Sequence, residues 1–154
     1  MQTVPTKMNG YRINAIVAHT SIKGSNVEDI HARILKAAES SEIIAAPEYA
    51  YHPGRPLIPE ERSRYLDELA QASHGRLIVP GTFVWQEGGL MHNTAYAIAD
   101  GTIIHEYDKI NQCGEDKIAD ACMLKPVFGK KPALFTWDKK RCGIEICADT
   151  GTLT

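Results

Sequence analysis

Three residues of reactive types, Glu48, Lys109 and Cys147, each occur at the end of a predicted β-strand. Strand ends often gather along one rim of a sheet, so these three side chains can face a common cleft. A thiol in such a cleft can act as a nucleophile, a carboxylate as its general base, and an ammonium group as a donor to a developing oxyanion.

Each of the three residues also has an ordinary explanation when it is considered alone. Free cysteines are usually small buried hydrophobes, and most glutamates and lysines are solvated surface charges. A reactive cysteine needs a partly open, electropositive site, and a general base needs a raised pKa. The prediction of a catalytic centre therefore depends on all three residues occurring together.

The first part of the chain alternates strands and helices that could position Glu48. Residues 11–19 and 43–46 read as strands, and the second of these runs directly into Pro47 and Glu48. Between them, Asn26 is placed to cap a helix over residues 27–40. The apolar face of that helix consists of Ile30, Ile34 and Leu35.

A second amphipathic helix begins at Pro59 and ends at His74-Gly75. Its apolar stripe consists of Tyr65, Leu66 and Leu69. A strand then begins at Leu77–Val79 and continues past Pro80-Gly81 toward Trp85.

The remaining strands are predicted by their turns. Gly88-Gly89 and Asp100-Gly101 are hairpin signals that delimit strands over 91–99 and 102–108, the second ending just before Lys109. Residues 111–132 fit no single pattern. The last predicted hairpin joins residues 133–137 to 141–146 through Asp138-Lys139 and leads to Cys147.

The order of elements predicts an α/β fold. Strands separated by helices favour parallel pairing, whereas strands joined by hairpins require antiparallel pairing. A mixed β-sheet with helices packed on one face satisfies both. We expect one domain over residues 11–154, preceded by a flexible leader over residues 1–10.

Composition narrows the class of protein. The chain has 154 residues, of which 44% are hydrophobic and 23% charged, with a net charge of −2, so a strong electrostatic grip on nucleic acid or membrane is not expected. No apolar run has the ~18–20 residues of a bilayer span. The polar N-terminus lacks a secretion signal, which predicts a cytoplasmic location. In that compartment the four cysteines are expected to be free thiols.

Four segments resemble motifs of the nitrilase superfamily of carbon–nitrogen hydrolases. Residues 46–50 read APEYA and resemble the glutamate motif of the family, and residues 79–83 read VPGTF and resemble the strand that follows it. The lysine segment is matched by NTAYAIADGTIIHEYDKI at 93–110, and the cysteine elbow by RCGIEICAD at 141–149. The order and spacing of these segments are those of the family.

The resemblance implies a role for each matched residue. Cys147 would be the nucleophile, and Glu48 would accept its proton and later deliver it to the leaving amine. Lys109 and the backbone N–H of Ala148 would stabilise the oxyanion. The intermediate would be a cysteine thioester, which water activated by Glu48 would release as an acid. The substrates would be small amides, N-carbamoyl compounds or nitriles, and no cofactor would be needed.

The family also suggests roles for residues near these motifs. Glu115 is the nearest candidate for a second, substrate-positioning glutamate, although a solvated loop carboxylate is an equal alternative. Asp149 is expected to form structural hydrogen bonds. Tyr49, Tyr51 and Trp85 could line a pocket, but core packing is the better interpretation of each.

The family fold is an α-β-β-α sandwich, and this sequence resembles its first half. The carbon–nitrogen hydrolase domain is therefore expected to be C-terminally incomplete, which leaves open whether the chain acts alone. The resemblance also implies a homo-oligomer. The alternative function is a truncated, non-catalytic module of the same family that regulates or binds a partner.

Other classes of protein have less support in the sequence. The spacings Cys113-x8-Cys122 and Cys142-x4-Cys147 include no CxxC pair, and the six histidines form no HExxH motif, so a metal site is not expected. No G-x-S-x-G elbow of a serine hydrolase occurs, and no phosphate-binding glycine loop is present.

A half-sandwich would expose an apolar sheet face, so the isolated chain should self-associate. Sedimentation velocity at several protein concentrations would show dimers or larger species. A monomer at every concentration would contradict the prediction that a covering half is missing.

Overall fold

The computed structural model describes residues 6–130 and 133–151. Its helices are α1 (Val27–Ala38), α2 (Pro59–Ala72) and α3 (Glu115–Ala121), and a short 3-10 turn spans Cys147–Asp149. The strands are β1 (Thr6–Met8), β2 (Tyr11–Ala15), β3 (Ile43–Ala45), β4 (Leu77–Val79), β5 (Thr82–Glu87), β6 (Leu90–Ala99), β7 (Thr102–Asp108), β8 (Lys125–Pro126), β9 (Ala133–Trp137) and β10 (Lys140–Ile144).

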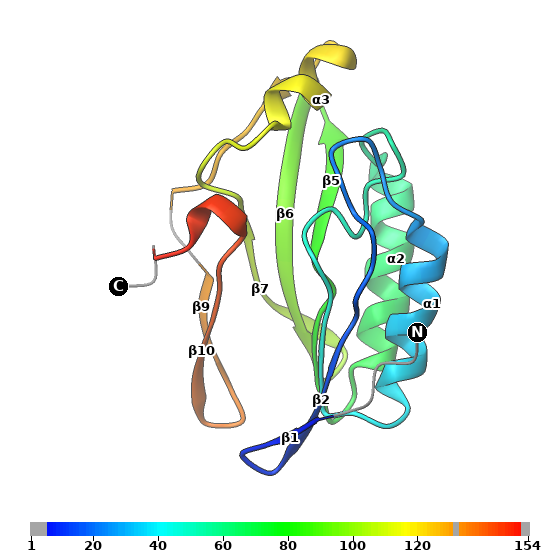
Figure 1. Cartoon of the computed structure of the whole chain (residues 1–154), viewed down its shortest axis with the longest axis vertical. Coiled ribbons are helices and arrows are strands. Elements are labelled where there is room, and N and C mark those ends of the chain that lie inside the picture. The colour runs from blue at the N-terminus through cyan, green and yellow to red at the C-terminus, as the bar shows by residue number, and fades with distance from the viewer. Residues whose placement is uncertain (1–5, 131–132, 152–154) are drawn as a thin grey trace.

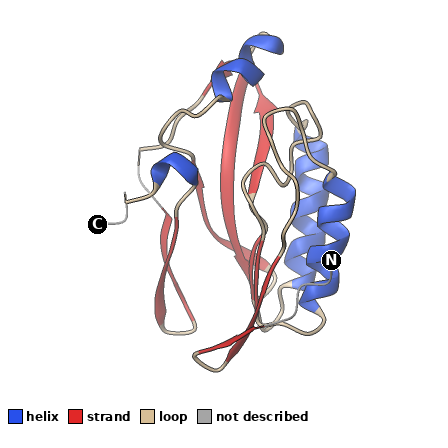
Figure 2. Ribbon diagram, viewed as in Figure 1, coloured by secondary structure: helices blue, strands red, loops and turns tan. Residues whose placement is uncertain are grey.

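The strands β1 to β8 form one mixed sheet, as Figures 1 and 2 show. Strands β2, β3 and β4 pair in parallel, each separated from the next by a helix. The ten-residue strand β6 then pairs antiparallel with β4, β5 and β7. The predicted α/β fold with a mixed sheet is therefore confirmed.

Helices α1 and α2 lie side by side on one face of this sheet (Figure 1). The side chain of Asn26 accepts a hydrogen bond from the Asp29 N–H and caps α1, as predicted. Ile34 and Leu69, from the two apolar stripes, are fully buried against Ile44 of β3. Within the described residues, neither these helices nor α3 is long and apolar enough to cross a lipid bilayer.

The opposite face of the sheet is partly covered by the β9–β10 hairpin, which forms a separate two-stranded sheet (Figure 2). Phe135 and Trp137 of this hairpin pack against Leu77 and Ala97 of the main sheet. The turn at Asp138 and Lys139 is confirmed, and both residues have positive φ angles. The chain that leads to Cys147 is therefore packed across the sheet face that the helices leave open.

Several boundaries differ from the sequence prediction. Strand β2 ends at Ala15 rather than at residue 19. Residues 6–8 of the expected flexible leader form β1, because Asn9 and Gly10 adopt positive φ angles and turn the chain into a hairpin with β2. Residues 1–5 lie outside the described part of the chain. The unassigned stretch 111–132 contains α3 and β8.

The strand expected to run from Leu77 toward Trp85 is broken into β4 and β5 at Pro80-Gly81. Both pieces still pair with the same strand, β6. Gly81 has a φ of 82°, and a Cβ atom built on it would lie 2.0 Å from the backbone oxygen of Pro47. The missing side chain of Gly81 thus lets the chain that carries Glu48 pass against the sheet.

Replacing Gly81 by alanine should destabilise the protein by more than about 1 kcal/mol, because both the φ angle and the contact with Pro47 oppose a side chain. Urea unfolding would measure the change. Gly89→Ala is the matched control, because Gly89 has a similar φ of 79° with open space around it. Equal losses for the two variants would show that φ alone matters and that the close approach does not.

Candidate active site

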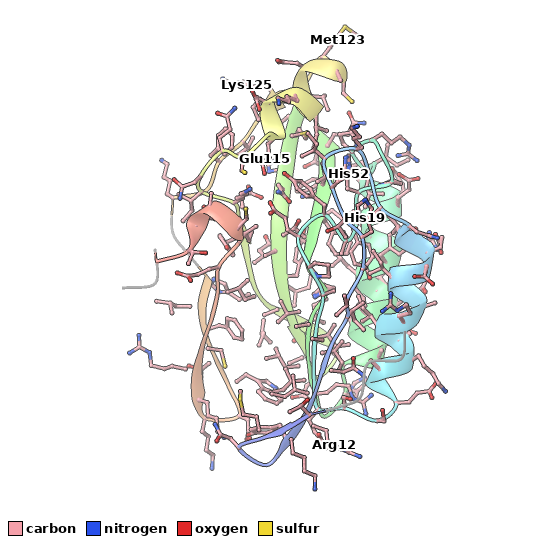
Figure 3. All side chains as sticks on the ribbon, viewed as in Figure 1. Arg12, His19, His52, Glu115, Met123 and Lys125 are labelled. Atoms are coloured by element: carbon pink, nitrogen blue, oxygen red, sulfur yellow. The ribbon has the colours of Figure 1, made fainter. Side chains whose placement is uncertain are left out.

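Lys109 follows β7 directly and is buried, with 1% of its side chain exposed. Its Nζ atom lies 2.7 Å from Oε1 of Glu48 and 2.8 Å from Oε1 of Glu115. Glu48 comes three residues after β3, and Glu115 begins α3, where Figure 3 labels it. The structure thus brings three of the predicted site residues into one ion-paired cluster.

The two carboxylates keep the buried lysine charged. Burial opposes the charge of Lys109, but its hydrogen bonds with Glu115 and Glu48 outweigh burial and raise its pKa above the ordinary value. The backbone holds the same residue in place, because the Lys109 N–H donates to the Asn93 carbonyl at 2.9 Å. The ammonium group is therefore a fixed positive charge.

Glu115 is saturated with hydrogen-bond donors. Besides Lys109, the Tyr49 hydroxyl donates to its Oε1 at 2.9 Å, and the Cys113 N–H donates to its Oε2 at 2.6 Å. Burial would raise the pKa of Glu115, but these donors overcome that effect and lower it. With 2% of its side chain exposed, Glu115 is a structural anion rather than a solvated loop carboxylate.

Glu48 has a different environment from Glu115. Its Oε1 accepts from Lys109 and, at 3.2 Å, from Asn93 Nδ2, and 18% of its side chain is exposed. One carboxylate of the cluster is thus fully engaged, while the other is partly open. A proton acceptor needs this kind of access.

Asn93 is a site residue that our sequence analysis did not single out. Its Nδ2 donates to both Glu48 and Glu115, at 3.2 and 3.1 Å, so it bridges the two like-charged groups. Asn93 is 2% exposed and lies in the middle of β6. An amide inside a buried strand was the available signal, because a buried polar side chain requires partners.

Cys147 opens the 3-10 turn that follows β10, with a φ of 46°. Asp149, in the same turn, is fully buried and accepts hydrogen bonds from the Ile110 and Asn111 N–H groups at 3.0 and 2.7 Å. The structural role predicted for Asp149 is confirmed. Its two bonds tie the turn that carries Cys147 to the chain just after Lys109.

The thiol of Cys147 interacts with the charges of the cluster. Partial burial raises its pKa, the negative charge of Glu48 raises it further, and the positive charge of Lys109 opposes both. A contribution from the Cys113 side chain also raises it. The resting thiol is consequently protonated at neutral pH.

Ala148 is the middle residue of the turn, and its carbonyl accepts from the side chain of Asn111 at 3.1 Å. The predicted donation of its N–H to an oxyanion remains a prediction. Among the described residues no group of three or more His, Cys, Asp and Glu side chains could hold a metal ion. All four cysteines are free.

The three aromatic residues considered as pocket walls differ from one another. Tyr51 is fully buried and stacks on Phe83, as expected of core packing. Tyr49 is also buried, as core packing predicts. Its hydroxyl in addition donates a hydrogen bond to Glu115, which core packing alone did not predict. Trp85 stacks with His92 and lines a cavity of about 370 Å³ that none of the catalytic candidates lines.

Comparisons with known proteins show similarity of fold. No protein-family model matches the sequence, and no curated protein matches it. Among solved structures, the glutamine-dependent NAD+ synthetase of Acinetobacter baumannii aligns with a TM-score of 0.66 and 18% identity over 90% of this chain and 28% of its own. Nit3 of Saccharomyces cerevisiae, a member of branch 10 of the nitrilase superfamily, aligns with a TM-score of 0.62 and 18% identity. The alignment covers 88% of this chain and 55% of Nit3.

A third structure, XC1258 of Xanthomonas campestris, is a CN-hydrolase superfamily protein that aligns with a TM-score of 0.60 and 13% identity. The alignment covers 88% of this chain and 53% of XC1258. The chain thus has the fold found in part of the nitrilase and CN-hydrolase structures. It spans about half the length of those two proteins and about a quarter of the synthetase.

Glu115→Gln should destabilise the protein by roughly 1–3 kcal/mol at neutral pH, because Lys109 loses one of its two anions. The pKa of Glu115 is lowered from its ordinary 4.5, so its contribution is present above pH 4.5 and is lost as the pH falls through the lowered value. Thermal unfolding from pH 7 to pH 3 should therefore show the two proteins converging. A difference in melting temperature between the two proteins that does not change with pH would contradict this prediction. An effect no larger than that of the exposed control Glu87→Gln would contradict it as well.

Proposed function

We propose that this chain carries the catalytic centre of a carbon–nitrogen hydrolase, in which Cys147 attacks a small amide, N-carbamoyl compound or nitrile. The observation that supports the proposal most strongly is the buried Lys109 held between Glu48 and Glu115 at 2.7 and 2.8 Å. The charges of Glu48 and Lys109 also act on the pKa of Cys147, which supports a position of the thiol near them.

The first step is a proton transfer inside the cluster. Glu48 takes the proton of the Cys147 thiol as the sulfur attacks the carbonyl carbon. The negative charge moves from the Glu48 carboxylate to the oxygen of the substrate carbonyl, and the total charge of the cluster and substrate stays constant. A thiol with a raised pKa thus becomes a nucleophile beside its base without forming a stable thiolate beforehand.

The second step stabilises the oxygen that becomes negative. The Lys109 ammonium and the Ala148 N–H donate to this oxyanion. Lys109 is suited to that role because its position is fixed before the substrate binds, so little reorganisation is needed. When the tetrahedral intermediate collapses, Glu48 returns the proton to the leaving nitrogen, which departs as ammonia or an amine and leaves a thioester on Cys147.

Hydrolysis of the thioester completes the cycle. Glu48, now ionised again, takes a proton from water as that water attacks the thioester carbon. The acid is released and the proton returns to the sulfur. Glu115 stays ionised throughout, because its donors lower its pKa, and it holds Lys109 and Asn93 in place.

A primary amide is the first substrate to test. The synthetase with a similar fold is described as glutamine-dependent, and the side chain of glutamine ends in a primary amide. The proposal includes action in the cytoplasm and assembly as a homo-oligomer. The alternative is a non-catalytic module of the same fold that regulates or binds a partner, and such a module would turn over none of these substrates.

Cys147→Ala should abolish turnover of any substrate found while leaving the fold intact.

Glu48→Gln should affect the alkylation rate of Cys147 and the turnover of substrate in different ways, whereas general damage to the site would lower both. Removing the charge of Glu48 lowers the pKa of Cys147, so alkylation of Cys147 by iodoacetamide at pH 7 should be at least as fast as in the native chain. Turnover should fall by about 100-fold or more, because the general base is gone.

The control is Glu87→Gln, which changes an exposed carboxylate on β5 and should alter neither rate. Circular dichroism would establish that each variant keeps the native fold. Turnover that persists in Cys147→Ala would exclude the proposed nucleophile. Full turnover in Glu48→Gln would exclude the proposed base.

A further inference from the structure

Cys113 is an exposed free thiol in the loop between Lys109 and α3. The proposed chemistry gives it no role. Its backbone is fixed nonetheless, because the Cys113 N–H donates to Glu115 Oε2 at 2.6 Å and Glu115 in turn binds Lys109. The backbone at Cys113 is thus held by the same cluster whose Glu48 and Lys109 charges act on the pKa of Cys147.

Three hydrogen bonds join this loop to the turn that carries Cys147. Two run from the backbone N–H groups of Ile110 and Asn111 to Asp149, and the third runs from the Asn111 side chain to the Ala148 carbonyl. Cys113 is two residues from Asn111, and Cys147 is the residue before Ala148. Consecutive Cα atoms are about 3.8 Å apart. Cys113 and Cys147 each lie within two residues of the hydrogen bond between Asn111 and Ala148, so their side chains can approach each other.

The side chains interact as well. The Cys113 side chain is also among the groups that raise the pKa of Cys147, which agrees with the proximity that these hydrogen bonds give the two segments. Both residues are exposed, so a small oxidant can reach either sulfur. The other two cysteines differ, because Cys122 ends α3 and Cys142 lies inside β10, away from the turn.

We propose that Cys113 and Cys147 are a site of oxidative modification, at which hydrogen peroxide produces a reversible disulfide. The thiolate of one cysteine attacks peroxide, which breaks the O–O bond and gives a sulfenic acid and hydroxide. The other thiol then attacks that sulfur and displaces water. Two thiols lose two electrons and two protons, and one peroxide becomes two waters.

The consequence for catalysis rests on the proposed function. With Cys147 as the nucleophile, the disulfide stops turnover and a thiol reductant restores it. The disulfide also prevents further oxidation of Cys147 to a sulfinic or sulfonic acid, neither of which a thiol reduces. The disulfide with Cys113 therefore protects the nucleophile, whichever of the two thiols reacts with peroxide first.

The experiment treats the native chain with hydrogen peroxide, blocks the remaining thiols with N-ethylmaleimide, and maps the peptides without reduction. A protease that cuts after glutamate separates Cys142 from Cys147, because Glu145 lies between them. The expected product joins the Cys113 peptide to the Cys147 peptide with the loss of two hydrogens. In a parallel sample without N-ethylmaleimide, the free thiol content falls from four per chain to two and returns to four with dithiothreitol.

Cys113→Ser and Cys142→Ser are the matched variants. Without Cys113, the cross-link should disappear and Cys147 should gain oxygen atoms that dithiothreitol does not remove. Without Cys142, the cross-link should form as in the native chain. The native chain carries the decisive measurement, so a variant that misfolds does not remove the test.

Three results would overturn the proposal: a Cys147 that gains oxygen without a cross-link in the native chain, a disulfide of Cys147 with Cys122 or Cys142, or a cross-link between chains. Peptide mapping needs no turnover. A cross-link in a chain without hydrolase activity would support the modification site and count against the proposed function, and an active chain without a cross-link would do the reverse.

Discussion

The burial of the Lys109 ammonium group is the constraint on which the rest of the site depends. A charge removed from water is costly unless opposite charges and hydrogen bonds replace its hydration. Glu48 and Glu115 supply two anions, and the Asn93 side chain donates to both of them. These groups come from the end of β3, the start of α3 and the middle of β6, so forming the ion pair requires the surrounding fold to be complete.

Two backbone features bring the chain into this arrangement. At Gly81 the sheet leaves space for the backbone oxygen of Pro47, which directly precedes Glu48. At the other side, the buried carboxylate of Asp149 binds two N–H groups just after Lys109 and so fixes the turn of Cys147. Each feature depends on a single residue, Gly81 or Asp149, and each of these residues contacts a segment more than 30 residues away in the sequence. Neither touches the reacting atoms, and both decide where those atoms lie.

The sequence pointed to Glu48, Lys109 and Glu115, which the structure brings together, but not to the residues that support them. Glu48 and Lys109 were visible because each is a reactive type at the end of a predicted strand and lies in a segment that resembles a family motif. Asn93 and the hydroxyl of Tyr49 were not, because their contacts with Glu115 join positions that become neighbours only after β5, β6 and α3 have assembled. The pairing of β9 with β10 was predictable, because it depends on a local turn. Their position in a separate sheet was not, because it depends on packing against distant residues such as Ala97.

The charge balance of the cluster explains why a carboxylate, rather than a histidine, suits this nucleophile. Partial burial raises the pKa of Cys147, and the negative charge of Glu48 raises it further against the opposing charge of Lys109. A cysteine beside a protonated imidazole has the opposite environment and is held as a thiolate. In the proposed mechanism the proton leaves as the sulfur attacks, so reactivity would depend on Glu48 being free to accept it. Glu115 makes that possible, because it remains the anion that neutralises Lys109 while Glu48 is protonated.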